Sequence, residues 1–177
     1  MAILKVARMG HPVLRAKARP LQAAEIRSPQ CQQLIDDMFD TMREYEGVGL
    51  AAPQIHESVR LFVAMVGEEG EKPQAVALIN PEISIVGKDV VEDWEGCLSI
   101  PGIRGRVPRA RQVSVRAYDR TGKRLEFKAS NFNARVLQHE TDHLDGVLFF
   151  DRMKSFESLT FLEEFRRYAH HDDVPEE

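Results

Sequence analysis

Several kinds of segment are missing from this 177-residue sequence, and each absence narrows the class of protein. Only two cysteines are present, Cys31 and Cys97, which is too few for a disulfide framework and favours a reducing compartment. No run approaches about 18 uninterrupted apolar residues, so no membrane-spanning helix is predicted. The stretch Met1–Val6 has neither the apolar run of a signal peptide nor the Ser/Arg-rich character of a transit peptide. We therefore expect a cytoplasmic protein.

An excess of positive charge is also lacking. The 28 Asp and Glu residues outnumber the 24 Lys and Arg residues, and a net charge of −4 gives no general case for binding nucleic acid. One basic run contains no interleaved aromatic residue, so we interpret it as the solvated edge of a strand. No direct binding to nucleic acid or to a membrane is expected. The run consists of Arg104, Arg106, Arg109 and Arg111.

Internal repeats, low-complexity segments and linkers are absent as well. The composition, with 43% hydrophobic and 29% charged residues, is that of a globular protein. A chain of this length can bury a substantial core within one domain. The sequence therefore predicts a single domain over residues 1–177.

Local patterns predict both helices and strands. Ser28-Pro29 is a typical helix start, and apolar residues at helical spacing follow it as far as Gly47. β-branched and apolar content predicts strands at Val59–Val66 and Ala75–Ile85. A hairpin is expected to join Gln112–Tyr118 to Arg124–Lys128.

Four further segments complete the expected organisation. We interpret Asp93–Gly102 as irregular because glycine and proline interrupt it, and Val147–Phe150 as a short strand. A C-terminal helix is expected at about residues 155–170, followed by a frayed acidic tail. The apolar side of that helix would consist of Leu159, Leu162, Phe165 and Ala169.

One short pattern indicates metal chemistry. In His139-Glu140-Thr141-Asp142-His143, two histidines four residues apart would share one face of a helix. Neutral imidazoles at this spacing can bind one divalent metal, which leaves Glu140 free as a general base. Ser130 or Asn131 can cap the start of this helix, and Gly146 can end it. The same stripe carries Phe132 and Val136.

The third ligand is not given by the helix itself. A catalytic site usually has three protein ligands and an open position, but after His143 only Asp145 follows closely, and it is turned away. Cys97 is an attractive candidate, because a metal would deprotonate its thiol. A metalloendopeptidase stays open as an alternative. A structural-metal or binding protein also stays open, although no suitably placed fourth histidine or cysteine is found for it.

Three segments together resemble the signature motifs of the peptide deformylase family. They are Gly47–Gln54 (GVGLAAPQ), Glu95–Ser99 (EGCLS) and Gln138–Leu144 (QHETDHL), and they occur in the family's order. The resemblance covers roughly residues 1 to 153. It implies an α+β fold in which antiparallel sheets surround a central helix that carries the His-Glu-x-x-His motif.

The resemblance also implies an activity, the metal-dependent hydrolysis of the N-formyl group from the N-terminal formylmethionine of nascent polypeptides, with release of formate. It assigns the metal to Cys97, His139 and His143, and the acid/base role to Glu140. It assigns stabilisation of the oxyanion to Gln54 and to the backbone N–H of Leu98. Substrate-side candidates are Gly49 and Arg104, and plausible pocket walls are Val48, Phe132 and Val136.

The cofactor implied by the resemblance is one divalent metal ion per chain. Iron(II) is expected, with zinc, nickel or cobalt as alternatives in purified protein. The expected partners are N-formylmethionyl nascent peptides. Some bacterial relatives end in a basic helix that docks on the ribosome, and a transient ribosome association stays open here, although Glu157, Glu163 and Glu164 make this end acidic. Two further departures are Gly102, where a larger residue is common, and Arg135, which we expect over the pocket rim or in solvent.

Overall fold

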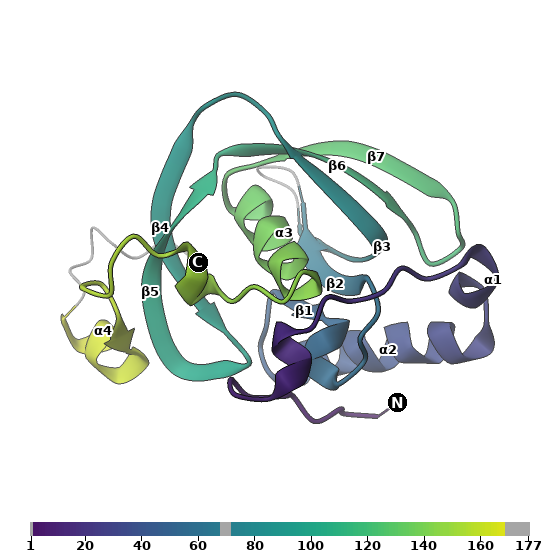
Figure 1. Ribbon diagram of the computed structural model, residues 1–177, viewed down its shortest axis with the longest axis horizontal. Coiled ribbons are helices and arrows are strands. Elements are labelled where there is room, and N and C mark those ends of the chain that lie inside the picture. Colours follow the sequence, from purple (N-terminus) through teal and green to yellow (C-terminus); the bar gives the residue numbers. More distant parts are fainter. Residues whose placement is uncertain (1, 68–71, 169–177) are drawn as a thin grey trace.

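Helix α3 (Asn131–Leu144) lies at the centre of the fold, between the β4–β5 hairpin and the larger sheet (Figure 1). The computed structural model describes residues 2–67 and 72–168. Nine of the 14 residues of α3 are buried, because strands from both sheets contact this helix. Ser130 is the N-cap residue, but its side chain makes no capping hydrogen bond. Beyond the helix, Gly146 has a φ of +73°, a conformation that suits glycine.

The described residues form two antiparallel sheets, which confirms the predicted α+β class. The larger sheet has the order β1-β2-β3-β6-β7 and the smaller one the order β4-β5-β8. The predicted hairpin is present as β6 and β7, paired from Gln112↔Ser130 to Tyr118↔Arg124. The strands are β1 (Gly49–Ala51), β2 (Leu61–Val66), β3 (Gln74–Ile85), β4 (Val90–Cys97), β5 (Ile100–Ala110), β6 (Gln112–Tyr118), β7 (Arg124–Ser130) and β8 (Thr160–Phe161).

Helix α2 (Pro29–Glu44) begins where the sequence predicts. The Ser28 hydroxyl accepts a hydrogen bond from the backbone N–H of Cys31, and proline occupies the first turn. The buried face of α2 includes Ile35 and Met38, and the helix contacts β1 and β2. Four shorter helices precede β8. One is the α-helix α1 (Ala23–Ile26), and three are 3₁₀ helices, η1 (Pro12–Arg15), η2 (Ala52–Ile55) and η3 (Phe149–Arg152).

The prediction of an irregular segment at Asp93–Gly102 is wrong. Most of it belongs to the β4–β5 hairpin, in which Trp94 pairs with Arg106 and Cys97 with Ile100 across a tight turn. Strand alternation directs Glu95 and Cys97 inward, where both are buried. Its inward-facing residues are polar or small, so the segment lacks the apolar alternation by which an ordinary strand is predicted.

The C-terminal predictions also need correction. Residues 147–150 do not form a strand, because Phe149 begins the 3₁₀ turn η3, where the Asp151 carboxylate accepts from the backbone N–H of Leu148. The expected helix at 155–170 starts only at Leu162, as α4 (Leu162–Tyr168), because Thr160 and Phe161 pair with the edge of β5. Ala169 and the acidic tail lie outside the described residues. No helix in the described part of the chain is long and apolar enough to cross a membrane.

Candidate metal centre and active site

The three residues expected to bind the metal come together. Cys97 lies at the end of β4, and His139 and His143 lie one turn apart on α3. Their ligand atoms all lie within 4.8 Å of one another, and the three residues are buried. The Cys97 sulfur is 3.3 Å from Nε2 of His143. Two segments about forty residues apart in sequence therefore supply one compact set of donors.

The chemistry of this set fits a divalent metal. Burial alone would raise the pKa of the Cys97 thiol, but the imidazoles of His143 and His139 lower it well below its usual value, so the thiolate needed for metal binding is favoured. Nδ1 of His139 donates to Glu95, which leaves its Nε2 for a metal. One thiolate and two imidazoles, without a fourth protein ligand among the described residues, match a catalytic site with an open position.

Glu95 orients His139 through the ring nitrogen that is not used for the metal. Its Oε2 accepts from Nδ1 of His139 at 2.8 Å, and its two oxygens accept from Nε and Nη2 of Arg109 at 2.8 and 3.0 Å. Nη1 of Arg135 donates to the same carboxylate at 2.8 Å. Although burial opposes ionisation, His139 and Arg109 hold the pKa of Glu95 well below its usual range. Glu95 is therefore an ionised carboxylate that fixes the tautomer and orientation of His139.

Two of the predictions about arginines are wrong. Arg109 is 5% exposed and joins Glu95 to Asp142, whose Oδ2 accepts from Nη1 of Arg109 at 2.5 Å. Arg135 is 6% exposed and, besides Glu95, donates to the carbonyls of Val91 and Val107. Neither residue is solvated, because each guanidinium neutralises a buried carboxylate. This group of side chains joins β4, β5 and α3 behind the metal ligands.

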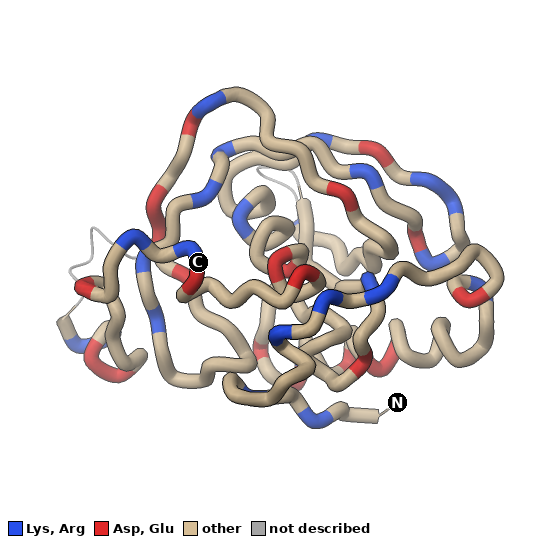
Figure 2. The backbone as a smooth tube through the Cα atoms, in the orientation of Figure 1, with Lys and Arg blue, Asp and Glu red and all other residues tan. Residues whose placement is uncertain are grey.

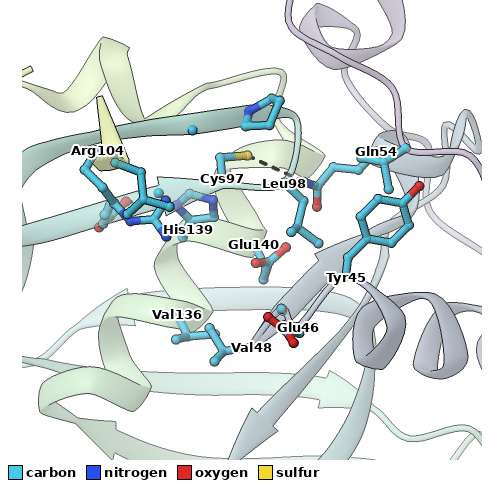
Figure 3. Close-up of a pocket in the computed structure, with 18 of the residues that line it drawn as sticks. Tyr45, Glu46, Val48, Gln54, Cys97, Leu98, Arg104, Val136, His139 and Glu140 are labelled. Atoms are coloured by element: carbon cyan, nitrogen blue, oxygen red, sulfur yellow. Dashed lines mark hydrogen bonds and ion pairs between the residues drawn. The ribbon is translucent and has the colours of Figure 1, made fainter. Parts of the chain in front are cut away.

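Glu140 points into the pocket beside the metal ligands (Figure 3). Burial raises its pKa to about 7, and the nearby imidazoles of His139 and His143 limit that rise. Its Oε2 has no hydrogen-bond partner among the described residues. Its other oxygen occupies the space next to Gly49, where any Cβ would overlap it. A carboxylate with this pKa and a free oxygen is suited to accept a proton at neutral pH.

Gln54 is oriented by its own backbone environment. Its Oε1 accepts from the backbone N–H of Ala51 at 2.8 Å, which directs Nε2 toward the metal ligands. Nε2 lies 3.5 Å from the Cys97 sulfur (Figure 3). It also lies 3.2 Å from the hydroxyl of Ser99. The site thus presents an amide donor beside the three metal ligands.

A pocket of about 680 Å³ opens over these groups. Phe132 is 56% exposed and Val48 46% exposed, so these two predicted wall residues lie near the mouth rather than in the depth of the pocket. Gln54, by contrast, is 2% exposed. Of the predicted site residues, only His143 is absent from the lining. The lining includes Val48, Gly49, Gln54, Cys97, Leu98, Arg104, Phe132, Val136, His139 and Glu140.

Residues 3–158 match the family model described as polypeptide deformylase. The chain belongs to the peptide deformylase family. It is 47% identical over 154 residues to a peptide deformylase of Halothermothrix orenii, covering 86% of this chain and 95% of that one. It is 44% identical over 158 residues to peptide deformylase 2 of Nostoc, with coverage of 86% and 87%.

A solved structure from the family is also similar. The Met-Ala-Ser-bound class I type b peptide deformylase of Acinetobacter baumannii superimposes with a TM-score of 0.81 at 38% identity, covering 86% of this chain and 99% of that one. This family is metal-dependent, which agrees with the cluster of Cys97, His139 and His143.

Proposed function

We propose that this site carries out the reaction of the family, the hydrolytic removal of the N-formyl group from the N-terminal methionine of nascent polypeptides, with release of formate. The observation that carries the proposal is the open set of three ligands, Cys97, His139 and His143, beside Glu140, whose Oε2 has no hydrogen-bond partner among the described residues. We assign the activity to a single catalytic domain over residues 1–177. The similar A. baumannii structure contains a bound peptide that begins with methionine, as a deformylated product would.

Cys97, His139 and His143 would hold the metal, which when bound lowers the pKa of water and polarises a carbonyl. Glu140 accepts the proton of the attacking water and returns it to the leaving amine. Nε2 of Gln54 and the backbone N–H of Leu98 donate to the oxygen on which negative charge develops. Each role uses a donor or acceptor on the wall of the same pocket.

The substrate backbone would lie along the motif strands. Gly49 begins the edge strand β1, whose backbone can pair with an extended peptide of any sequence. Val48, Phe132 and Val136 would surround the methionine side chain, and Arg104 would lie beyond it. This arrangement reads the first residue by its side chain and later residues mainly by their backbone.

Iron(II) is the proposed native metal, with zinc, nickel or cobalt able to replace it in purified protein. We also propose a location in the cytoplasm and a transient association with the ribosome. The described end of the chain gives no support for a basic docking helix, because α4 carries Glu163 and Glu164 as well as Arg166 and Arg167.

Anaerobic purification with metal analysis, combined with kinetics on formyl-Met and acetyl-Met peptides, tests this function. We expect formate release from the formyl peptide, and a rate at least 10²-fold lower on the acetyl peptide, because two donors converge on one small oxygen in a closed site. An internally cleavable peptide serves as the control for endopeptidase activity. Cleavage of that control, or equal rates on the formyl and acetyl peptides, would contradict the proposal.

The position of Gly49 gives a sharp test of the site geometry. Gly49→Ala places a methyl group where the carboxylate of Glu140 now lies, so either β1 or Glu140 must shift. We expect kcat/KM to fall by at least about 10²-fold, the scale of a misplaced catalytic group. Gly87→Ala is the control, because nothing lies within 4 Å of its Cβ, and its cost is confined to backbone strain far from the pocket. Normal kcat/KM in Gly49→Ala would show that Glu140 does not act from this position.

A further inference from the structure

The charges at the mouth of the pocket differ from those of the whole chain. Three cations line the pocket without a carboxylate partner in the described part of the chain, and we call them the cationic rim: Lys5, Arg8 and Arg104. Elsewhere, Lys and Arg are interspersed with Asp and Glu along the backbone (Figure 2). The net charge of the chain is −4. The positive rim is therefore a local feature and not a consequence of composition.

Two of the rim residues are held in place by the segment that carries them. The backbone N–H of Ala7 donates to the carbonyl of Gln54 at 2.6 Å, and that of Met9 to the carbonyl of Ser99 at 2.8 Å. Val6 and Ala7 are buried. These contacts fasten the N-terminal segment to two of the catalytic motifs and keep the exposed side chains of Lys5 and Arg8 beside the pocket.

Arg104 is placed there by a different arrangement. Its guanidinium covers Gly96, where any Cβ would overlap it, and Nη1 donates to the carbonyl of Ile103 at 3.2 Å. Burial lowers the pKa of Arg104 and the positive charge of Arg166 on α4 lowers it further, while the nearby Cys97 opposes this lowering in part. The half-buried cation thus lies in an unfavourable potential that a nearby anion would relieve.

Negative groups in the same pocket do not cancel the rim. Glu95 is already shared by Arg109 and Arg135, Glu140 is buried at the reaction centre, and the thiolate of Cys97 would be neutralised by the metal. Glu46 is the exposed carboxylate of the lining, and it lies with Tyr45 on the opposite side of the pocket from Arg104 (Figure 3). A cleft lined mainly by one sign of charge attracts ligands of the other sign.

We propose that the cationic rim selects formyl-peptides that carry a carboxylate within the first few residues after the formylmethionine. This inference rests on the proposed deformylase function and adds to it a preference in substrate sequence. The carboxylate is that of an aspartate or glutamate side chain, because a nascent chain attached to its tRNA has no free α-carboxylate. The rim residues act on the binding and association of the peptide, so we expect the preference to appear as a difference in kcat/KM.

The experiment compares three peptides with amidated C-termini, formyl-Met-Ala-Glu-Ala, formyl-Met-Ala-Gln-Ala and formyl-Met-Ala-Lys-Ala, on the metal-loaded full chain. At low ionic strength we expect kcat/KM to be about tenfold higher for the Glu peptide than for the Lys peptide, with the Gln peptide between them. At 0.5 M salt the ratio should fall to about two, because the screening length is then only a few ångströms.

Two variants with the same change in net charge distinguish an effect of the cationic rim from an effect of the protein's total charge. Lys5→Gln/Arg8→Gln/Arg104→Gln should bring the Glu/Lys ratio close to one. The matched control is Lys88→Gln/Arg124→Gln/Lys128→Gln, which alters three cations outside the pocket lining and should leave the ratio as in the parent. A control that loses the preference equally would overturn the assignment to the rim.

Two further results would also decide against the proposal. A Glu/Lys ratio near one in the parent protein, with normal turnover of the neutral Gln peptide, would overturn the preference and leave the deformylase function intact. Failure to process the neutral peptide would instead contradict the function itself. Formyl-Met-Ala as free acid and as amide forms a separate arm, and a preference confined to that free α-carboxylate would overturn the proposal for nascent chains.

Discussion

The Glu140→Gln variant is expected to retain its metal and to deformylate peptides roughly 10²-fold or more slowly than the parent chain, the scale of a lost acid/base. The amide fills nearly the same space beside Gly49 but cannot accept a proton from water. Metal binding should persist, because the donor atoms belong to Cys97, His139 and His143. The measurement is kcat together with metal content per chain.

Thr141→Val is the matched control for this variant. Thr141 follows Glu140 on α3, and its hydroxyl has no hydrogen-bond partner among the described residues, so a side chain of the same shape should keep kcat within about twofold. If Glu140→Gln were purified without metal, Glu140 would be a ligand and not an acid/base. Nearly normal turnover by metal-loaded Glu140→Gln would show that Glu140 does not transfer the proton.

Removing the charge of Arg109 is expected to produce the largest loss of stability. Arg109→Met leaves the buried carboxylate of Asp142 with only the half-exposed Arg152 and takes one of two arginines from Glu95. Removing one partner of a buried ion pair lowers the free energy of unfolding by about 3 kcal/mol or more, since the remaining charge stays buried without its partner. Urea denaturation of the metal-loaded protein measures this change.

The pair between Arg116 and Glu82 provides the comparison. It joins strands β6 and β3 at 2.8 Å, but its side chains are 50% and 68% exposed. Arg116→Met should therefore change the unfolding free energy by less than about 1 kcal/mol. Equal losses in the two variants would mean that burial behind the metal ligands has no special energetic role. Weaker metal retention in Arg109→Met alone would further support its action on His139 through Glu95.

The sequence predicts the central helix and its metal-binding face better than it predicts the segments that pack around them. The spacing of His139 and His143 predicts α3 and the metal face, since i and i+4 must share one side of a helix. Thiolate chemistry makes Cys97 a candidate ligand, but only its motif places it beside α3, because the contact between β4 and α3 depends on the packing of distant segments. Boundaries at the C-terminal end were missed for a similar reason. Pairing of Thr160 and Phe161 with β5 replaces the helix that local spacing favours.

The buried arginines were missed although signals for them exist. Arg135 precedes His139 by four residues on α3, so it shares the face of the metal ligand. Glu95 precedes Cys97 by two residues on a strand, so both must point inward if one does. A buried glutamate needs a positive partner, and this requirement could have indicated that Arg109 or Arg135 is buried. What no local pattern could supply is which cation meets which carboxylate.

The close contact between Gly49 and Glu140 bears on resistance to inhibitors. Every other side chain at position 49 would displace the group proposed to move the proton, so genetic variants at this codon should lose activity before they lose affinity for a drug. A compound held mainly by the backbone of Gly49 and by the space above Glu140 would thus bind where escape mutations are incompatible with activity. Contacts to exposed wall residues such as Val48 or Phe132 lack this protection, because those side chains can change without disturbing the reaction centre.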